Sequence, residues 1–230
     1  MAIAYVSVSN GQADTVSSIT VSHTVASGSD RLLVAKTHTD DTTTPADMPV
    51  TGVTYNSDAL TKADDHLSTG GEKNTIELWY MVAPDEGTFN CVATFTGTVD
   101  ACMLTVENYT GIDQADTLNT TNSAFTISTG PIQVAVTTDV ANCVIVDMVH
   151  TTSSTRTVAV NAGQTETYNV QQTGAFKGAG AYEIVTTATT YTQSWTVNTT
   201  SDWLIIATAF NPAVASSSTY SGYYGSGGYF

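Results

Sequence analysis

Apolar and polar residues alternate along most of this chain with a period close to two. The segment ITVSHTV at 19–25, for example, places every second side chain on the same face of an extended strand. Gly, Asn, Asp and Ser separate such runs, and β-branched residues pack well on a pleated surface. We predict strands near residues 2–8, 18–24, 31–37, 52–55, 59–62, 75–82, 87–96, 101–109, 124–128, 132–137, 143–150, 157–160, 166–170, 180–186, 190–197 and 202–210. The pattern predicts an all-β protein, an antiparallel β-sandwich of jelly-roll-like type with little helix.

Two halves of the chain run through the same order of elements. RLLVAKT at 31–37 is echoed by CVIVDMVHT at 143–151, and ACMLTVENYTG at 101–111 by DWLIIATAFNP at 202–212. Few residues are identical between the halves, so two interpretations stay open. Either the chain contains an internal repeat of residues 15–113 and 126–212, or the halves share only the alternation of apolar and polar residues that β-strands have in common. We assign residues 1–213 to the sandwich domain in either case.

The three tryptophans, Trp79, Trp195 and Trp203, all fall within predicted strands. They are expected to pack in the core or on a sheet face rather than to form a platform for stacking sugars. Cys91, Cys102 and Cys143 lie in apolar runs and are expected to be buried thiols, although a bridge from Cys91 to Cys102 is an alternative.

The net charge of the chain limits which partners it can bind. The chain has 230 residues, six Lys plus Arg and 21 Asp plus Glu, which gives a net charge of -15. Such a surface repels phosphate backbones, so we expect no nucleic-acid partner. No apolar run approaches the length of about 20 residues that crosses a bilayer, so we expect no membrane insertion. The N-terminus lacks the pattern of a signal peptide, which predicts synthesis in a host cytoplasm.

Candidate chemistry is sparse. Glu72 with Glu77, or Asp64 with Asp65, would resemble a glycosidase pair only if the fold placed the carboxylates across a cleft. The histidines at 23, 38, 66 and 150 are dispersed, and no P-loop, GxSxG or HExxH motif is present. We therefore predict that the protein is not an enzyme and that it has no cofactor.

Two acidic stretches supply oxygen atoms of the kind that calcium prefers: one with Asp40, Asp41, Thr42 and Asp47, the other with Asp113, Gln114 and Asp116. Neither matches an EF-hand loop, and we interpret both as solvated turns rather than metal sites. The first stretch lies in the polar segment 39–50, which is either a binding loop or merely a variable one.

The last segment, residues 214–230, differs from the body. It is rich in Gly and Ser and carries five aromatic residues, Tyr220, Tyr223, Tyr224, Tyr229 and Phe230. Such a segment cannot bury a core of its own, but aromatic side chains are the preferred anchors at protein interfaces. These five residues are our candidate assembly contacts, with the glycines between them letting the backbone lie close to a partner surface.

Several segments together resemble a known module. They are TVSHTVASGSDRLLV at 20–34, VTGVTYNSDALTK at 50–62, IELWYMVAPDEGTFNCVATFTG at 76–97, ENYTGIDQADT at 107–117 and DWLIIATAF at 202–210. The combination is similar to a jelly-roll or concanavalin-like β-sandwich module of phage virion proteins and microbial surface proteins, with ELWYMVAP and the GTFN that follows as its most specific part. The resemblance implies an architecture and a virion or cell-surface setting, and it transfers no functional residues.

Three classes of function follow from these observations. The first is a structural virion protein of a bacteriophage, such as a capsid decoration or head-fibre subunit, whose partners are copies of itself and a capsid or other virion protein. The second is a receptor- or carbohydrate-binding module of a tail fibre or surface adhesin. The third is a subunit of an extracellular filament or sheath, in which the tail or the N-terminal strand adds to a neighbouring sheet edge.

Overall fold

The computed structural model describes residues 2–41, 50–68, 73–128, 130–172 and 174–214. Within these ranges the chain forms antiparallel β-sheets and no helix, which confirms the predicted all-β sandwich. The candidate assembly residues Tyr220, Tyr223, Tyr224, Tyr229 and Phe230 lie outside the described residues.

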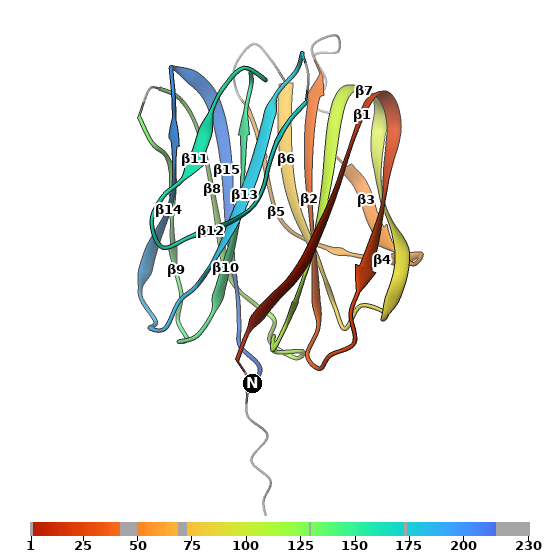
Figure 1. Cartoon of the computed structure of the whole chain (residues 1–230), viewed down its shortest axis with the longest axis vertical. Coiled ribbons are helices and arrows are strands. Elements are labelled where there is room, and N and C mark those ends of the chain that lie inside the picture. Colours follow the sequence, from red (N-terminus) through yellow and green to blue (C-terminus); the bar gives the residue numbers. More distant parts are fainter. Residues whose placement is uncertain (1, 42–49, 69–72, 129, 173, 215–230) are drawn as a thin grey trace, which may run out of the picture.

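The first half of the chain forms one sheet that folds over on itself (Figure 1). Its strands are β1 (Ala4–Val25), β2 (Leu32–Asp41), β3 (Val50–Tyr55), β4 (Asp58–Ala59), β5 (Thr61–Leu67), β6 (Lys73–Val82) and β7 (Gly87–Thr110). The order is β4-β3-β7-β2-β6-β5, and β1 also pairs with β7. Because β1 and β7 are long and bend, each belongs to an inner layer and to an outer layer of this half.

The second half forms two separate sheets. The larger contains β8 (Leu118–Ser128), β10 (Val144–Thr151), β12 (Thr165–Gln171), β13 (Lys177–Ile184) and β15 (Ser201–Phe210), in the order β12-β13-β10-β15-β8. The smaller contains β9 (Ile132–Thr137), β11 (Val158–Val160) and β14 (Thr190–Val197), in the order β11-β14-β9.

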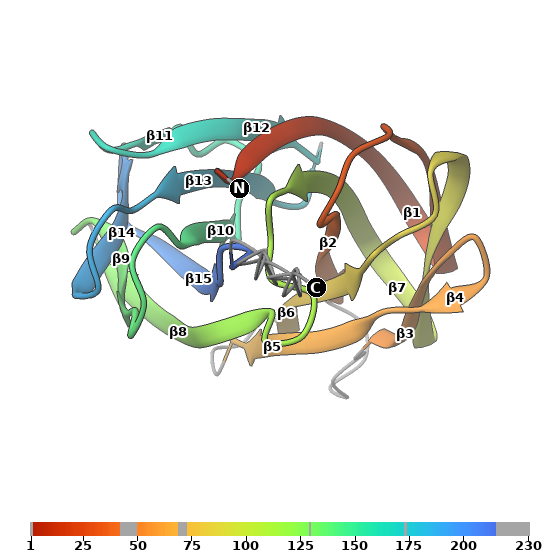
Figure 2. The same cartoon turned by 90° about the horizontal axis from the view of Figure 1, so that it is seen from below.

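The described residues form four layers. The part of the first sheet that contains β2, β6 and β5 faces the β12-β13-β10-β15-β8 sheet, and these two form the inner layers. The β3–β4 part of the first sheet and the β11-β14-β9 sheet form the outer layers. Seen from below, β1 lies beside β12 and β5 lies beside β8, which nearly closes the inner layers into a barrel (Figure 2). Side chains join both seams: Gln12 donates to the carbonyl of Gln171, and Thr121 donates to Asp64. One apolar cluster fills each half, and a third, containing Val34, Val146 and others, lies between the halves.

The two halves repeat the same pairing order. Leu32 on β2 pairs with Val82 and Tyr109, and the corresponding Val144 on β10 pairs with Ile184 and Phe210. Each central strand is thus flanked by equivalent partners. The origin of this order in a duplicated sequence stays a prediction.

The strand boundaries differ from prediction mainly at these long strands. We expected separate strands at 2–8 and 18–24 and at 87–96 and 101–109, whereas β1 and β7 each run continuously through both. The alternation slips where β1 crosses layers, since its register shifts between Val16 and Ser18 and Thr15 has a φ of 55°. Where the apolar positions change from one face of a strand to the other, the alternation resembles a loop between two strands, although β1 is continuous there.

Candidate functional site

Two buried histidines that are far apart in the sequence stack on each other between the two halves. His38 on β2 and His150 on β10 stack with ring centroids 5.8 Å apart, and Phe176 stacks on both. Each histidine lies six residues after its strand's first equivalent position, Leu32 or Val144, so the two occupy the same place in the two halves. Sequence analysis treated them as dispersed, although the aligned segments RLLVAKTHT and CVIVDMVHT carry the signal.

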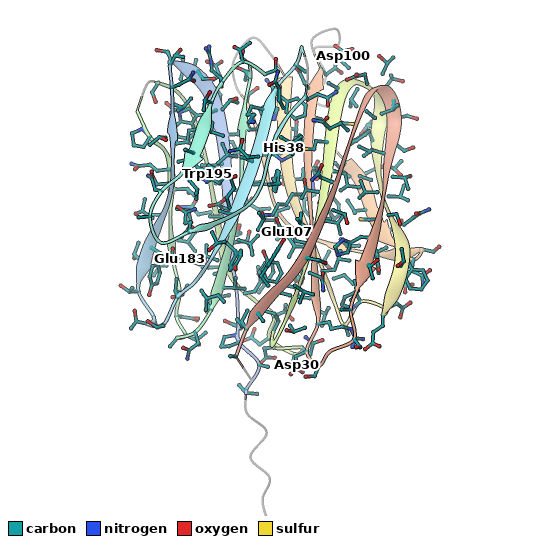
Figure 3. The ribbon with its side chains drawn as sticks, in the orientation of Figure 1. Asp30, His38, Asp100, Glu107, Glu183 and Trp195 are labelled. Atoms are coloured by element: carbon teal, nitrogen blue, oxygen red, sulfur yellow. The ribbon has the colours of Figure 1, made fainter. Side chains whose placement is uncertain are left out.

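A buried ion pair lies next to these histidines. Lys36 Nζ donates to Glu107 Oε1 at 2.7 Å, and neither side chain has any exposed surface. The hydroxyls of Tyr109 and Thr167 also donate to the Glu107 carboxylate, at 2.7 and 2.6 Å. Figure 3 shows His38 and Glu107 inside the body, between the two halves. The carboxylate is therefore satisfied by three donors from three strands, as a buried charge requires.

Tyr168 links the ion pair to the histidines. Its hydroxyl lies 2.9 Å from His38 Nε2, and the Lys36 ammonium lies 5.2 Å from the centre of its ring. On the other side, His150 Nε2 lies 3.1 Å from Asn74 Oδ1. One connected polar cluster thus joins β2, β6, β7, β10 and β12 across the two halves.

Burial controls the ionisation of this cluster. Desolvation lowers the pKa of His150 to about 3 and, together with the charges of His150 and Lys36, holds the pKa of His38 well below its ordinary value. Desolvation and the Glu107 carboxylate raise the pKa values of Tyr109 and Tyr168 far above the ordinary value. Both histidines are neutral in the folded protein at neutral pH, and both phenols stay protonated.

The cluster is sealed from solvent, so it suits a structural role rather than the binding of a substrate. Each of its charged or aromatic members is at most 5% exposed. It holds the two halves in one relative position, because hydrogen bonds restrict their register where apolar contacts alone would allow sliding.

The two ends of the described chain meet at one pole of the body, the lower end in Figure 1. Ile3 is buried there, and Ile112 forms a bridge with Pro212. The amide of Ala213 donates to the carbonyl of Gly111 at 2.8 Å. Gly111 has a φ of +78°, and a Cβ on it would lie 2.4 Å from the carbonyl oxygen of Ala2, so only glycine lets the two ends approach so closely.

The residue after this anchor is exposed. Val214, the last described residue, is 80% exposed, and it lines a small hollow together with Val140 and Pro212. The base of the tail is thus fixed to the body up to Ala213, next to a partly apolar surface.

The stretch with Asp113, Gln114 and Asp116 lies at this pole and forms a turn. Asp113 Oδ1 accepts from the amides of Ala115 and Asp116, and these hydrogen bonds lower the pKa of the Asp113 carboxyl. Within the described ranges, no group of three or more His, Cys, Asp or Glu side chains is placed to hold a metal ion. The prediction of a solvated turn is wrong for Asp40 and Asp41 of the other acidic stretch, because both lie in β2 and are only 7% and 1% exposed. Thr42 and Asp47 lie outside the described residues.

The described carboxylates considered for catalysis are held by ion pairs or hydrogen bonds, and Asp65 and Glu77 share Lys62, at 3.8 and 2.9 Å. Glu77 is buried, accepts from Lys62 at 2.9 Å and from the Val50 amide at 2.7 Å, and has its pKa raised chiefly by burial. Asp64 bonds Thr121 across the seam between β5 and β8. Glu72 lies outside the described residues. Asp64 and Glu77 are both tied into the structure by these contacts.

The tryptophans and cysteines follow their predictions. Trp79, Trp195 and Trp203 are 7%, 0% and 4% exposed, which confirms that they pack in the core. Cys91, Cys102 and Cys143 are buried free thiols, and burial raises the pKa of Cys91 and Cys102 to about 12 and that of Cys143 to about 11.

No family model, curated protein or solved structure matches this chain. The likeness to modules of virion and surface proteins therefore stays a prediction from the sequence segments. In the part of the chain that the structure describes, no helix has the length and apolar character needed to cross a membrane.

Proposed function

We propose that this chain is a non-enzymatic structural protein of a bacteriophage virion, a capsid decoration or head-fibre subunit that uses its termini for contacts between subunits. The observation that carries the proposal is the pole where Ile3 and Ala213 are both held to the body. A tail that starts from a fixed point reaches a defined neighbouring surface with a smaller loss of entropy than one that starts from a mobile point.

The properties of the body support the same role. The two halves are joined by an apolar cluster and by a buried polar cluster, which favours a body that moves as one block rather than as two domains. The polar surface consists largely of Thr, Ser and Asn, with a net charge of -15 that limits nonspecific association. The partners in this proposal are other copies of the chain and a capsid or other virion protein, and the location is the virion.

Removal of residues 215–230 tests the proposal. The truncated protein should keep the melting temperature of the full-length body, because Ala213 and the residues before it stay in place, but it should no longer assemble. A control in which the tail keeps its length but has Ser in place of its five aromatic residues should behave like the truncation. Unchanged assembly of the truncated protein would contradict the proposal.

A further inference from the structure

A groove on the outer layer of the first half is built from uncharged side chains. It lies between the turn that joins β3 to β4 and the outer part of β7, and it has a volume of about 440 Å³, within the range of about 300–1,000 Å³ typical of small-molecule sites. Five of its seven lining residues are polar and neutral: Thr54, Asn56, Ser57, Thr88 and Asn90.

The turn that forms one wall is held in an uncommon conformation. Asn56 and Ser57 have φ values of 49° and 73°, the left-handed pair of a two-residue hairpin. Glycine is the residue that usually takes the second of these positions, so Ser57 holds its hydroxyl there at a cost in backbone strain.

Contacts from neighbouring segments fix this wall. The Asn56 amide donates to the carbonyl of Asn90 at 3.2 Å, and the Asn56 side chain donates to Asp85 at 2.8 Å. The Thr88 hydroxyl is paired with that of Thr24 at 2.7 Å. The side chains of Asn56 and Thr88 are therefore positioned before any ligand arrives, which reduces the entropy lost on binding.

Two apolar residues complete the lining, Phe89 and Val92. The ring of Phe89 is partly buried and packs edge-on against Tyr55, with centroids 5.8 Å apart. Tyr55 is itself fixed, because its hydroxyl donates to the carbonyl of Gly87 at 3.0 Å. Most of the Phe89 ring packs against the apolar cluster of the first half, so Val92 and the exposed part of Phe89 give the groove a small apolar patch beside its hydroxyl and amide groups.

This combination selects a class of ligand. An anion is disfavoured by the net charge of -15, and a cation finds no carboxylate in the lining. A purely apolar ligand would leave the hydroxyls and amides without partners. A neutral ligand with many hydroxyls and exposed C–H faces satisfies both the polar wall and the apolar patch.

We propose that this groove binds a neutral saccharide. The inference goes beyond the structural role proposed above and does not rest on it. Every described Trp, Tyr and Phe is buried or partly buried, so recognition here relies on Thr and Asn side chains with Phe89 as a minor apolar contact.

The test uses the full chain and a panel of immobilised neutral oligosaccharides with terminal glucose, galactose, mannose or N-acetylglucosamine, beside sialylated and sulfated counterparts. We expect binding of at least one neutral member and of no charged member. Titration of that oligosaccharide into ¹⁵N-labelled protein should shift the backbone amide signals of Thr88 and Asn90. Binding of charged glycans alone, or no binding of any neutral member at millimolar concentration, would overturn the proposal.

A pair of matched variants locates the site. Asn90→Ala removes both a donor and an acceptor from the groove and should weaken binding by about tenfold. Asn10→Ala makes the same chemical change at an exposed strand position outside the groove and should bind as the wild type does. Equal binding by the wild type and Asn90→Ala would show that the groove is not the site. Subunit assembly, measured on the same variants, should be unaffected.

Discussion

At the scale of single residues, the Lys36–Glu107 pair shows how the body tolerates a full charge in its centre. The Glu107 carboxylate accepts from Lys36, Tyr109 and Thr167, so each of its oxygens has a donor. The second half has Met148 where the first has Lys36, and Thr208 where the first has Glu107. The equivalent strand pair is therefore stable without an ion pair.

This contrast predicts the effect of removing one partner. Lys36→Met should destabilise the protein by about 3–5 kcal/mol, because it leaves the Glu107 charge buried and unpaired. Urea unfolding at pH 7 measures the change. The double variant Lys36→Met/Glu107→Gln should recover most of the lost free energy of unfolding. If Lys36→Met alone is as stable as the wild type, the Lys36–Glu107 pair does not carry a charge.

The stacked histidines predict a dependence of stability on pH. The pKa of His150 is about 3 in the folded protein against an ordinary value of 6.5, so the unfolded chain binds the proton more tightly. The stabilisation from neutral His150 is complete above about pH 6.5 and is lost as the pH falls towards 3. His38 acts in the same direction, and Lys36 next to it adds to the cost of a second positive charge.

The variant His150→Gln isolates this effect. Between pH 7 and pH 5 the wild type should lose about 2 kcal/mol more of its free energy of unfolding than the variant does. The pKa of Asp147 is raised to about 7, so its protonation favours the folded state as the pH falls. This contribution is the same in the wild type and in His150→Gln, so it cancels in the comparison. His66→Gln, at a partly exposed position on β5, is the control and should change the pH dependence far less. Identical pH profiles for the wild type and His150→Gln would contradict the assignment.

At the scale of strands, Gly180 on β13 shows how the second half makes room for its polar cluster. A Cβ on Gly180 would lie 2.4 Å from Tyr168 Cε1 and 2.8 Å from the carbonyl oxygen of Asp147. The equivalent position in the first half is Leu78, which pairs with Lys36 as Gly180 pairs with Met148. The Tyr168 ring thus occupies space that a larger residue on β13 would need.

Gly180→Ala should therefore destabilise the protein by about 1–3 kcal/mol through overpacking. Gly52→Ala on β3 is the matched control, because a Cβ there meets nothing within 4 Å, and its effect should be neutral or slightly stabilising. Thermal melting of the two variants distinguishes them. Equal melting temperatures would mean that β12 and β13 separate easily to accept the methyl group.

The same elements show what the sequence could and could not predict. Period-two alternation located most strands, and the burial of Trp79 and Trp195 followed from their place in those runs. The continuous courses of β1 and β7 did not follow, because a strand that crosses from one layer to another shifts its inward face midway. The cluster around His38 also stayed hidden, since a polar residue in an inward position resembles a break in the pattern.

At the scale of the whole molecule, the two inner sheets form a stiff body with both described chain ends at one pole. Val214, the last described residue, is exposed at that pole. In the proposed division of roles, the body supplies stability and residues 215–230 supply contacts between subunits.

The native mass in solution tests this division most directly. Sedimentation equilibrium should be measured for the full chain of 24.1 kDa and for a variant with Ser in place of Tyr220, Tyr223, Tyr224, Tyr229 and Phe230. We predict a multiple of the chain mass for the full chain and a single chain for the variant, with the same melting temperature for both. The same oligomeric mass for both proteins would contradict the account, because the contacts between subunits would then belong to the body rather than to the tail.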